Sequence, residues 1–294
     1  MLELHIEPCA RHEIDQLIST LEESGALSIA MMDQNDTPIL EPAPGETPLW
    51  DQLVIQALYD EEEDACDAQV LLSVYYPHLT KTLHTIVDRD WERVCLDHFT
   101  PQQFGRRLWV CPSWHQAPRP DQINLILDPG LAFGTGTHPT TALCLTWLDD
   151  APITGKTILD YGCGSGILAL AALKLGAQHA YAVDIDDQAL IATKHNASSN
   201  QMTDKTLTIS QPTHLKEISV DIILANILLS PLLTLQDDFH QYLQPHGQLV
   251  VSGLFASQAN ALIEAYQPHF IHQSTQQQEE WVLLTFLARD HHHP

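Results

Sequence analysis

Residues 158–169 read ILDYGCGSGILA: an apolar strand pattern, three alternating glycines and then an apolar helix pattern. Another glycine-rich stretch, DPGLAFGTGTHPTT, lies earlier in the chain, at residues 128–141; it is the first glycine loop, and residues 162–166 form the second. The chain has 13 glycines, and six of them lie in these two stretches. Glycine is favoured where the backbone takes a positive φ or passes close to a ligand. We therefore expect the two loops to hold a ligand between them.

Strand and helix patterns alternate around these loops, from residue 123 to residue 290. We expect strands at residues 123–127, 157–161, 180–186, 221–227, 247–254 and 281–288, and helices at 139–150, 167–177, 188–200, 232–243 and 257–266. Apolar strands alternating with helices are typical of a doubly wound, Rossmann-like α/β sheet of parallel strands covered on both faces. Such a sheet binds its ligand at the carboxyl ends of the strands, where both loops fall. We assign residues 123–290 to a ligand-binding domain.

Residues 1–100 carry a smaller pattern. We expect strands at 2–6, 26–32 and 69–76, helices at 10–25 and 79–99, and a Pro-rich loop at 37–50. This alternation predicts a small α/β domain, of the ferredoxin-like kind. Residues 101–122, with a short strand at 107–111 and with Pro118 and Pro120, are expected to be a linker.

The charge of the chain is unevenly spread. Its formal net charge is −25, and residues 1–100 hold 21 acidic against 4 basic residues. A field of this sign repels nucleic acid and attracts basic partners. The run DEEEDACD at 60–67 is either a solvated, solubilising face or part of a surface for such a partner.

Composition excludes several classes of protein. The amino terminus carries acids where a secretory signal carries bases, and no apolar run approaches the length of a membrane span. The six cysteines are dispersed without a C-x-x-C pair, and the 17 histidines show no metal-ligand spacing. We expect a cytoplasmic protein with reduced thiols, no metal site and no membrane contact.

Three kinds of glycine loop compete for the ligand. Gly155-Lys156-Thr157 resembles the end of a phosphate-binding loop, but Asp150 stands where that motif requires glycine, and the segment precedes a strand. Residues 164–169 fit the dinucleotide fingerprint G-x-G-x-x-G/A, with Asp184 further on. Residues 160–166 equally fit the D-x-G-x-G-x-G loop of methyltransferases that use S-adenosylmethionine.

The carboxylate before the loop favours the methyl donor. Asp160 ends the strand that precedes the glycines. It would repel a pyrophosphate at the helix amino terminus but would attract the ammonium and sulfonium of S-adenosylmethionine. Opposite charges about 4 Å apart attract by around 4 kcal/mol at an effective dielectric constant of 20. A dinucleotide site and a simple strand-to-helix turn remain the alternatives.

Asn226 is the candidate on the acceptor side. It follows the apolar run IILA, residues 222–225, and precedes Pro231. A carboxamide oxygen at the ligand edge of a strand can accept a hydrogen bond from an amine nucleophile. The alternative is a turn-forming or helix-capping asparagine.

Together, residues 128–141, 160–166, 184–186 (DID) and 226–232 (NILLSPL) resemble the signature set of the ribosomal protein L-eleven methyltransferase family. The resemblance implies a class I methyltransferase sheet with an acidic substrate-recognition domain. It also implies S-adenosylmethionine-dependent trimethylation of lysine ε-amino and α-amino groups on this basic large-subunit ribosomal protein.

The resemblance assigns residues as well. It implies that Thr141, Gly162, Asp184 and Asn226 contact S-adenosylmethionine, and we expect Asn226 to be catalytic as well. Phe133 and His138 lie in the first glycine loop, so we expect them to wall the site; for His138 a solvent-exposed or loop-stabilising role is the alternative. We expect a monomer that binds no nucleic acid directly. The alternatives are a small-molecule or glutamine methyltransferase, which the absence of NPPY after position 225 disfavours, and a nicotinamide-dependent oxidoreductase or a donor-binding module without turnover.

Overall fold

The computed structural model describes residues 1–35, 39, 46–86, 99–128, 136, 138–215 and 218–290. The chain falls into two units, Met1–Val94 and Cys95–Pro294. No helix in the described ranges combines the length and the apolar character that a bilayer crossing requires.

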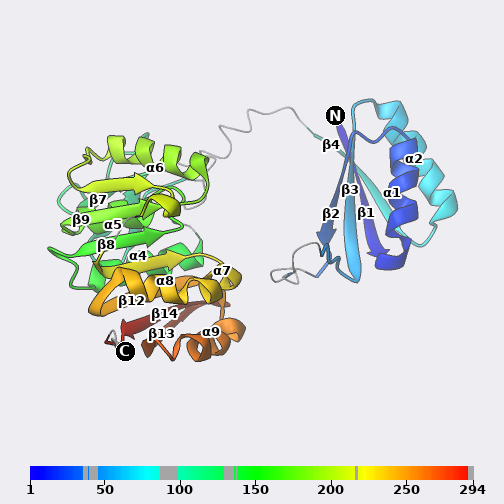
Figure 1. Ribbon diagram of the computed structural model, residues 1–294. Helices are drawn as coiled ribbons and strands as arrows, with labels where there is room; N and C mark the ends of the chain where they lie inside the picture. The colour runs from blue at the N-terminus through cyan, green and yellow to red at the C-terminus, as the bar shows by residue number, and fades with distance from the viewer. Residues whose placement is uncertain are drawn as a thin grey trace. The chain divides into compact units, whose positions relative to one another are not determined.

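The first unit has one sheet and two helices. Its strands β1 (Leu2–Ala10), β2 (Ser28–Asp33), β3 (Gln52–Tyr59) and β4 (Thr80–Thr85) form a sheet in the order β2-β3-β1-β4, with every neighbouring pair antiparallel. The short η1 (Arg11–Glu13) leads into α1 (Ile14–Glu23), and α1 and α2 (Glu62–Tyr75) cover one face of the sheet (Figure 1). The alternation of β3 buries Leu53 and Ile55 in one core with Leu17 and Leu72 of the helices.

Several expectations for the first unit are wrong. Residues 69–76, expected as a strand, lie mostly in α2, and the helix expected from residue 79 begins instead as β4. β3 was not expected at all. The reason in α2 is that apolar side chains occupy both its inner and its outer face, so the helical period is hidden. Most of the Pro-rich loop expected at residues 37–50 lies outside the described residues, and so do residues 87–98 of the helix expected at residues 79–99.

The main sheet of the second unit has the order β10-β9-β8-β11-β12-β14-β13. Its strands are β8 (Thr157–Tyr161), β9 (His179–Val183), β10 (Leu207–Ser210), β11 (Val220–Asn226), β12 (Leu243–Phe255), β13 (Phe270–Gln278) and β14 (Trp281–Ala288). Pairing is parallel from β10 to β12 and antiparallel at β14 and β13, so the expected wholly parallel sheet is wrong at this edge. The chain builds outward from β8 to β10 and then returns to place β11 on the other side of β8. This switch point is where a doubly wound sheet binds its ligand.

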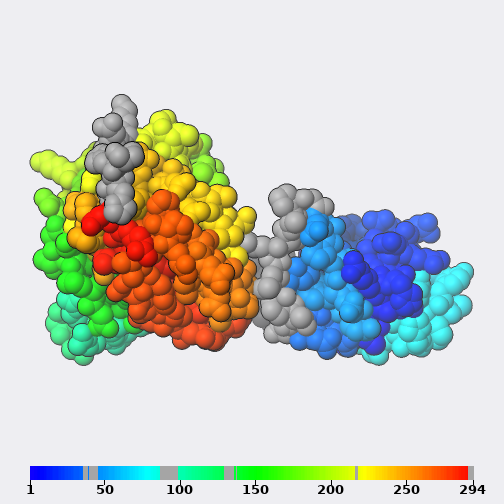
Figure 2. Space-filling model, turned by 60° about the horizontal axis from the view of Figure 1, so that its bottom comes forward, coloured from blue at the N-terminus to red at the C-terminus, as the bar shows by residue number. Residues whose placement is uncertain are grey.

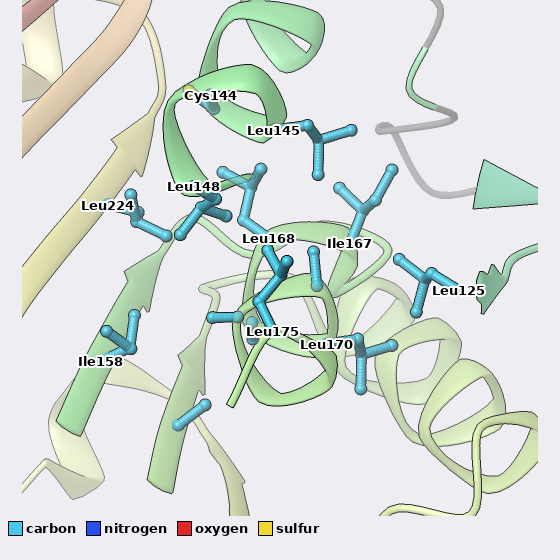
Figure 3. Packing of buried hydrophobic residues seen from close by; sticks show 14 of the residues in the cluster. Leu125, Cys144, Leu145, Leu148, Ile158, Ile167, Leu168, Leu170, Leu175 and Leu224 are labelled. Atoms are coloured by element: carbon cyan, nitrogen blue, oxygen red, sulfur yellow. The ribbon is translucent and has the colours of Figure 1, made fainter. Parts of the chain in front are cut away.

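Helices cover both faces of this sheet, as expected. They are α4 (Pro139–Asp150), α5 (Ile167–Lys174), α6 (Asp187–Ser199), α7 (Leu229–Thr234), α8 (Gln236–Tyr242) and α9 (Ala259–Tyr266), with the short η2 (Pro212–His214) and η3 (Ala256–Gln258). Adjacent residues of β8 enter different cores: Ile158 joins the cluster with α4 and α5, and Leu159 joins the cluster with Phe239 of α8. Figure 3 shows Leu148 of α4 and Leu168 of α5 packed together in the first of these cores.

Residues 101–122 do not form the expected linker. They carry β5 (Gln102–Phe104) and β6 (Leu108–Cys111), which form a separate sheet with β7 (Ile123–Ile126) inside the second unit. The buried carboxylate of Asp149, near the end of α4, accepts hydrogen bonds from the backbone N–H groups of Arg106 (2.6 Å) and Arg107 (3.2 Å). A Cβ on Gly105 would lie 2.5 Å from the Oδ2 atom of Asp149, so the turn needs glycine there. β7, expected in the main sheet, belongs to this smaller one.

Candidate active site

The second glycine loop joins β8 to α5 at the switch point. Gly162, Gly164 and Gly166 all take a positive φ, of 77°, 53° and 80°. A Cβ on Gly162 would lie 2.3 Å from the Cγ2 atom of Ile227, the residue that follows β11. The loop therefore runs close against the end of β11 because it has no side chain at this point.

Asp160 lies beneath this loop, almost fully buried at the end of β8. Its Oδ2 atom accepts a hydrogen bond from the Ala169 N–H of α5 at 2.9 Å. Its Oδ1 atom has no hydrogen-bond partner among the described residues, although the side chain lines a cavity. Burial raises the pKa of this carboxyl to about 7. A buried carboxylate that has one unpaired oxygen and belongs to a residue lining the cavity is suited to a cationic ligand group and unsuited to a pyrophosphate.

Asp184 holds the loop from the side of β9. Its two carboxylate oxygens accept hydrogen bonds from the N–H of Gly164 at 2.9 Å and from the N–H of Asp186 at 3.0 Å. Each oxygen keeps a further lone pair, and the half-buried side chain lines the same cavity as Asp160. This is the arrangement that vicinal ribose hydroxyls require, with fixed acceptors at the end of the neighbouring strand.

Asn226 ends β11 on the other side of the loop. Its Nδ2 atom donates a hydrogen bond to the Oγ1 atom of Thr141 at 3.2 Å. Thr141 is in the first turn of α4 and is buried, so it lies behind Asn226 and is not among the residues that line the cavity. The structure therefore brings together Thr141 and Asn226, each predicted to contact the donor, but only Asn226 lines the cavity.

One cavity of about 450 Å³ joins these groups. Three of the four residues predicted to contact the donor, Gly162, Asp184 and Asn226, line it together with Asp160. Its other walls come mainly from apolar or small residues of the loop and of the segments after β9, β10 and β11: Tyr161, Cys163, Gly164, Ile167, Leu168, Ile185, Pro212, Ile227, Pro231, Thr234 and Leu235. A mostly apolar cleft with a few convergent polar groups is typical of a cofactor site.

Sequence reasoning missed part of this wall. Thr234 and Leu235, at the end of α7, carry no recognisable motif, and Pro212 lies in η2 after a strand that was not expected. A Pro at position 231, soon after Asn226, was the available signal that the chain turns here.

The first glycine loop is only partly described. Phe133, Gly130 and Gly134 lie outside the described residues, so the closure of this loop over a ligand stays a prediction. His138 caps the amino terminus of α4, with its Nδ1 atom 2.8 Å from the Oγ1 atom of Thr140. Its ring meets the Trp281 ring edge-on at 4.8 Å, and Phe255 stacks on Trp281 at 4.1 Å. This row of rings was not predicted, because its members are far apart in the sequence.

Comparison with known proteins agrees with this geometry. Residues 1–289 match the family model described as ribosomal protein L11 methyltransferase (PrmA). A Legionella pneumophila (strain Lens) protein of that name is 52% identical over 98% of this chain and 99% of its own length. An Actinobacillus pleuropneumoniae serotype 5b (strain L20) protein of the same name is 46% identical over 93% of this chain and 94% of its own.

A solved structure supports the same assignment. The crystal structure of a ribosomal protein L11 methylase from Lactobacillus delbrueckii subsp. bulgaricus is 33% identical and superposes with a TM-score of 0.60. The match covers 65% of this chain and 100% of that one. The chain therefore belongs to the ribosomal protein L11 methyltransferase family, a family of S-adenosylmethionine-dependent enzymes.

Proposed function

We propose that this enzyme methylates amino groups of ribosomal protein L11, trimethylating lysine ε-amino groups and the α-amino group. The observation that carries the proposal is the convergence of Asp160, Gly162, Asp184 and Asn226 on one cavity in a chain that matches the family over residues 1–289. The free Oδ1 atom of Asp160 supplies the negative charge that a cationic methyl donor needs.

Each donor-binding residue has a physical task. Gly162 lets the loop lie against Ile227 at the end of β11, so that its backbone lines the donor cavity, and Asp184 accepts hydrogen bonds from the ribose hydroxyls of the donor. Asp160 faces its cationic methionine end. Thr141 acts indirectly: its hydroxyl accepts the hydrogen bond that orients the Asn226 amide, and it does not itself line the cavity. S-adenosylmethionine supplies an already activated methyl group, so these residues have only to hold and align it.

On the acceptor side the enzyme must present a neutral amine. A lysine amine with an ordinary pKa near 10.4 is protonated at neutral pH. The apolar walls of the cavity disfavour the ammonium form and so favour proton loss. The Asn226 oxygen then accepts a hydrogen bond from the amine and points its lone pair at the methyl carbon. Such alignment lowers the barrier by on the order of 7–11 kcal/mol.

We further propose that the first unit recognises the substrate. Its β1–α1–β2–β3–α2–β4 order, with an antiparallel sheet and both helices on one face, supports a ferredoxin-like domain. Its excess of acidic residues suits a basic protein and disfavours direct contact with RNA. Because its proposed substrate is a ribosomal protein, we also propose that the enzyme acts in the cytoplasm, and we expect it to be a monomer.

The function is tested by incubating the full-length enzyme with radiolabelled S-adenosylmethionine and purified L11, followed by mass spectrometry of the labelled protein. We expect the wild-type enzyme to transfer label to L11. Asn226→Ala should still bind the donor but lose most of its turnover. Gln241→Ala, an amide-to-Ala change on α8, is the control and should keep full activity. Unchanged turnover in Asn226→Ala would remove this residue from the mechanism, and an unlabelled L11 would overturn the proposed substrate.

A further inference from the structure

A groove in the first unit lies between the carboxyl end of α1 and the outward face of α2. It encloses about 710 Å³, and its lining includes three carboxylates and four apolar side chains: Glu23, Asp64, Asp67, Val70, Leu71, Val74 and Tyr75. The described residues of this lining include no Lys, Arg or His. The groove therefore combines an apolar strip with negative charge.

The apolar strip contributes little to the fold of the first unit. Val70, Val74 and Tyr75 are 65%, 71% and 68% exposed, whereas the core is closed by Ala65, Ala68 and Leu72 on the inner face of α2. Single exposed apolar residues are ordinary, but a contiguous group marks a binding surface. Residues 70, 71, 74 and 75 are spaced to lie together on one side of a helix. Figure 2 shows the α2 segment, in cyan, at the surface of the molecule.

Helix stability does not explain all of the charge. Glu62, Glu63 and Asp64 lie in the first turn of α2, where the helix dipole favours acids. Asp67 lies beyond that turn, and Glu23 is the last residue of α1, where the dipole disfavours a carboxylate. Both line the groove. These two carboxylates are explained better by a cationic partner than by the helices that carry them.

We propose that this groove, the α1–α2 groove, binds a basic and partly apolar segment of the protein substrate. The proposal rests on the proposed function, since it assigns the docking surface for L11. Lys or Arg side chains would lay their aliphatic stems on Val70 and Val74 while their charged ends meet Asp67 and Glu23. Such complementarity speeds association and fixes the register of the partner.

The test uses the full-length enzyme and measures KM and kcat for L11, together with the Kd for S-adenosylmethionine. Val74→Arg places a cation in the strip, so we expect KM for L11 to rise by about tenfold or more, with donor Kd and kcat unchanged. Asp67→Asn should raise KM by a smaller factor that disappears at high salt, because screening already removes that attraction. Met32→Arg on β2, at a residue 39% exposed, is the matched control and should leave KM unchanged.

The outcomes separate this inference from the proposed function. Wild-type enzyme that labels L11 while Val74→Arg keeps its KM would overturn the docking site alone. An equal rise of KM in Met32→Arg would also overturn it, because it would show that a cation anywhere on the first unit weakens binding of L11. Wild-type enzyme that binds the donor but leaves L11 unlabelled would overturn the proposed function and this inference with it. Because all three substituted side chains are exposed, thermal unfolding should match wild type and serves as the check on folding.

Discussion

Asn226 at the end of β11 donates a hydrogen bond to Thr141 in the first turn of α4, at 3.2 Å and across 85 residues of sequence. The bond joins the strand that carries the proposed catalytic amide to the helix that follows the first glycine loop. Because Thr141 is buried, its hydroxyl is fixed by its surroundings and in turn fixes the rotation of the Asn226 amide. The direction in which the amide oxygen faces the cavity therefore depends on α4.

Thr141→Val should weaken turnover more than donor binding. The substitution keeps the shape of the side chain but removes the acceptor for Asn226 Nδ2. A lost hydrogen bond of this kind costs about 1 kcal/mol, so we expect kcat to fall by roughly five- to tenfold. Thr141→Ser keeps the hydroxyl and should retain most of the activity. Equal losses in the two variants would show that packing, and not the hydrogen bond, is what Thr141 provides.

Gly162→Ala should abolish donor binding. The added Cβ would lie 2.3 Å from the Cγ2 atom of Ile227, and the φ of 77° is strained for any other residue. Isothermal titration calorimetry with S-adenosylmethionine measures the effect. Ile227→Ala removes the clashing methyl, so adding it to Gly162→Ala should restore part of the affinity. A double variant no better than Gly162→Ala would mean that backbone strain alone accounts for the loss.

The convergence of Gly162, Asp184 and Asn226 on one cavity was predictable because these residues follow strand patterns that are local in sequence. The glycines of residues 162–166, the acid at Asp184 and the amide at Asn226 each follow an apolar strand, and parallel strands of one sheet bring such ends together. The free oxygen of Asp160 and the contact between Asn226 and Thr141 were not predictable in this way. They depend on side-chain packing that no spacing encodes.

The errors in the fold have equally specific causes. α2 looked like a strand because Val70, Val74 and Tyr75 make its outer face apolar, and those residues belong to the proposed α1–α2 groove. β13 was missed because only Phe270 and Ile271 are apolar, and every residue after Phe270 is exposed, so the strand shows no alternation. In both places exposed residues, which burial does not constrain, dominate the pattern.

The buried carboxyl of Asp160 should make donor affinity depend on pH. Burial raises its pKa from 3.8 to about 7. Below this value the side chain is mostly neutral, and a cationic ligand must pull it into the ionised form. Calorimetry between about pH 5.5 and pH 7 should therefore show affinity for S-adenosylmethionine rising with pH, by up to about tenfold per pH unit, and levelling off above pH 7. Asp160→Asn should bind weakly, with a flat profile over this range.

The same carboxyl sets the sign of a stability effect in the ligand-free enzyme. A raised pKa means that the folded state favours the protonated carboxyl. The stability that this carboxyl contributes is therefore fully present below about pH 4 and is lost as the pH rises through about 7. Ligand-free Asp160→Asn should therefore gain stability relative to wild type as the pH rises from about 5 to about 8, measured by urea unfolding. A constant difference across this range would show that Asp160 does not titrate there.

Asp149→Ala should destabilise the second unit far more than Asp150→Ala. The Asp149 side chain is fully buried and accepts hydrogen bonds from the Arg106 and Arg107 backbone, which its loss would leave unsatisfied. We expect the free energy of unfolding to fall by about 2–4 kcal/mol. The neighbouring Asp150 pairs with Arg106 at 2.7 Å between side chains that are 60% and 81% exposed, and such a surface pair is worth about 0–1 kcal/mol. Urea unfolding of the two full-length variants measures the difference, and equal losses would mean that Asp149 does not anchor the β5–β6 turn to α4.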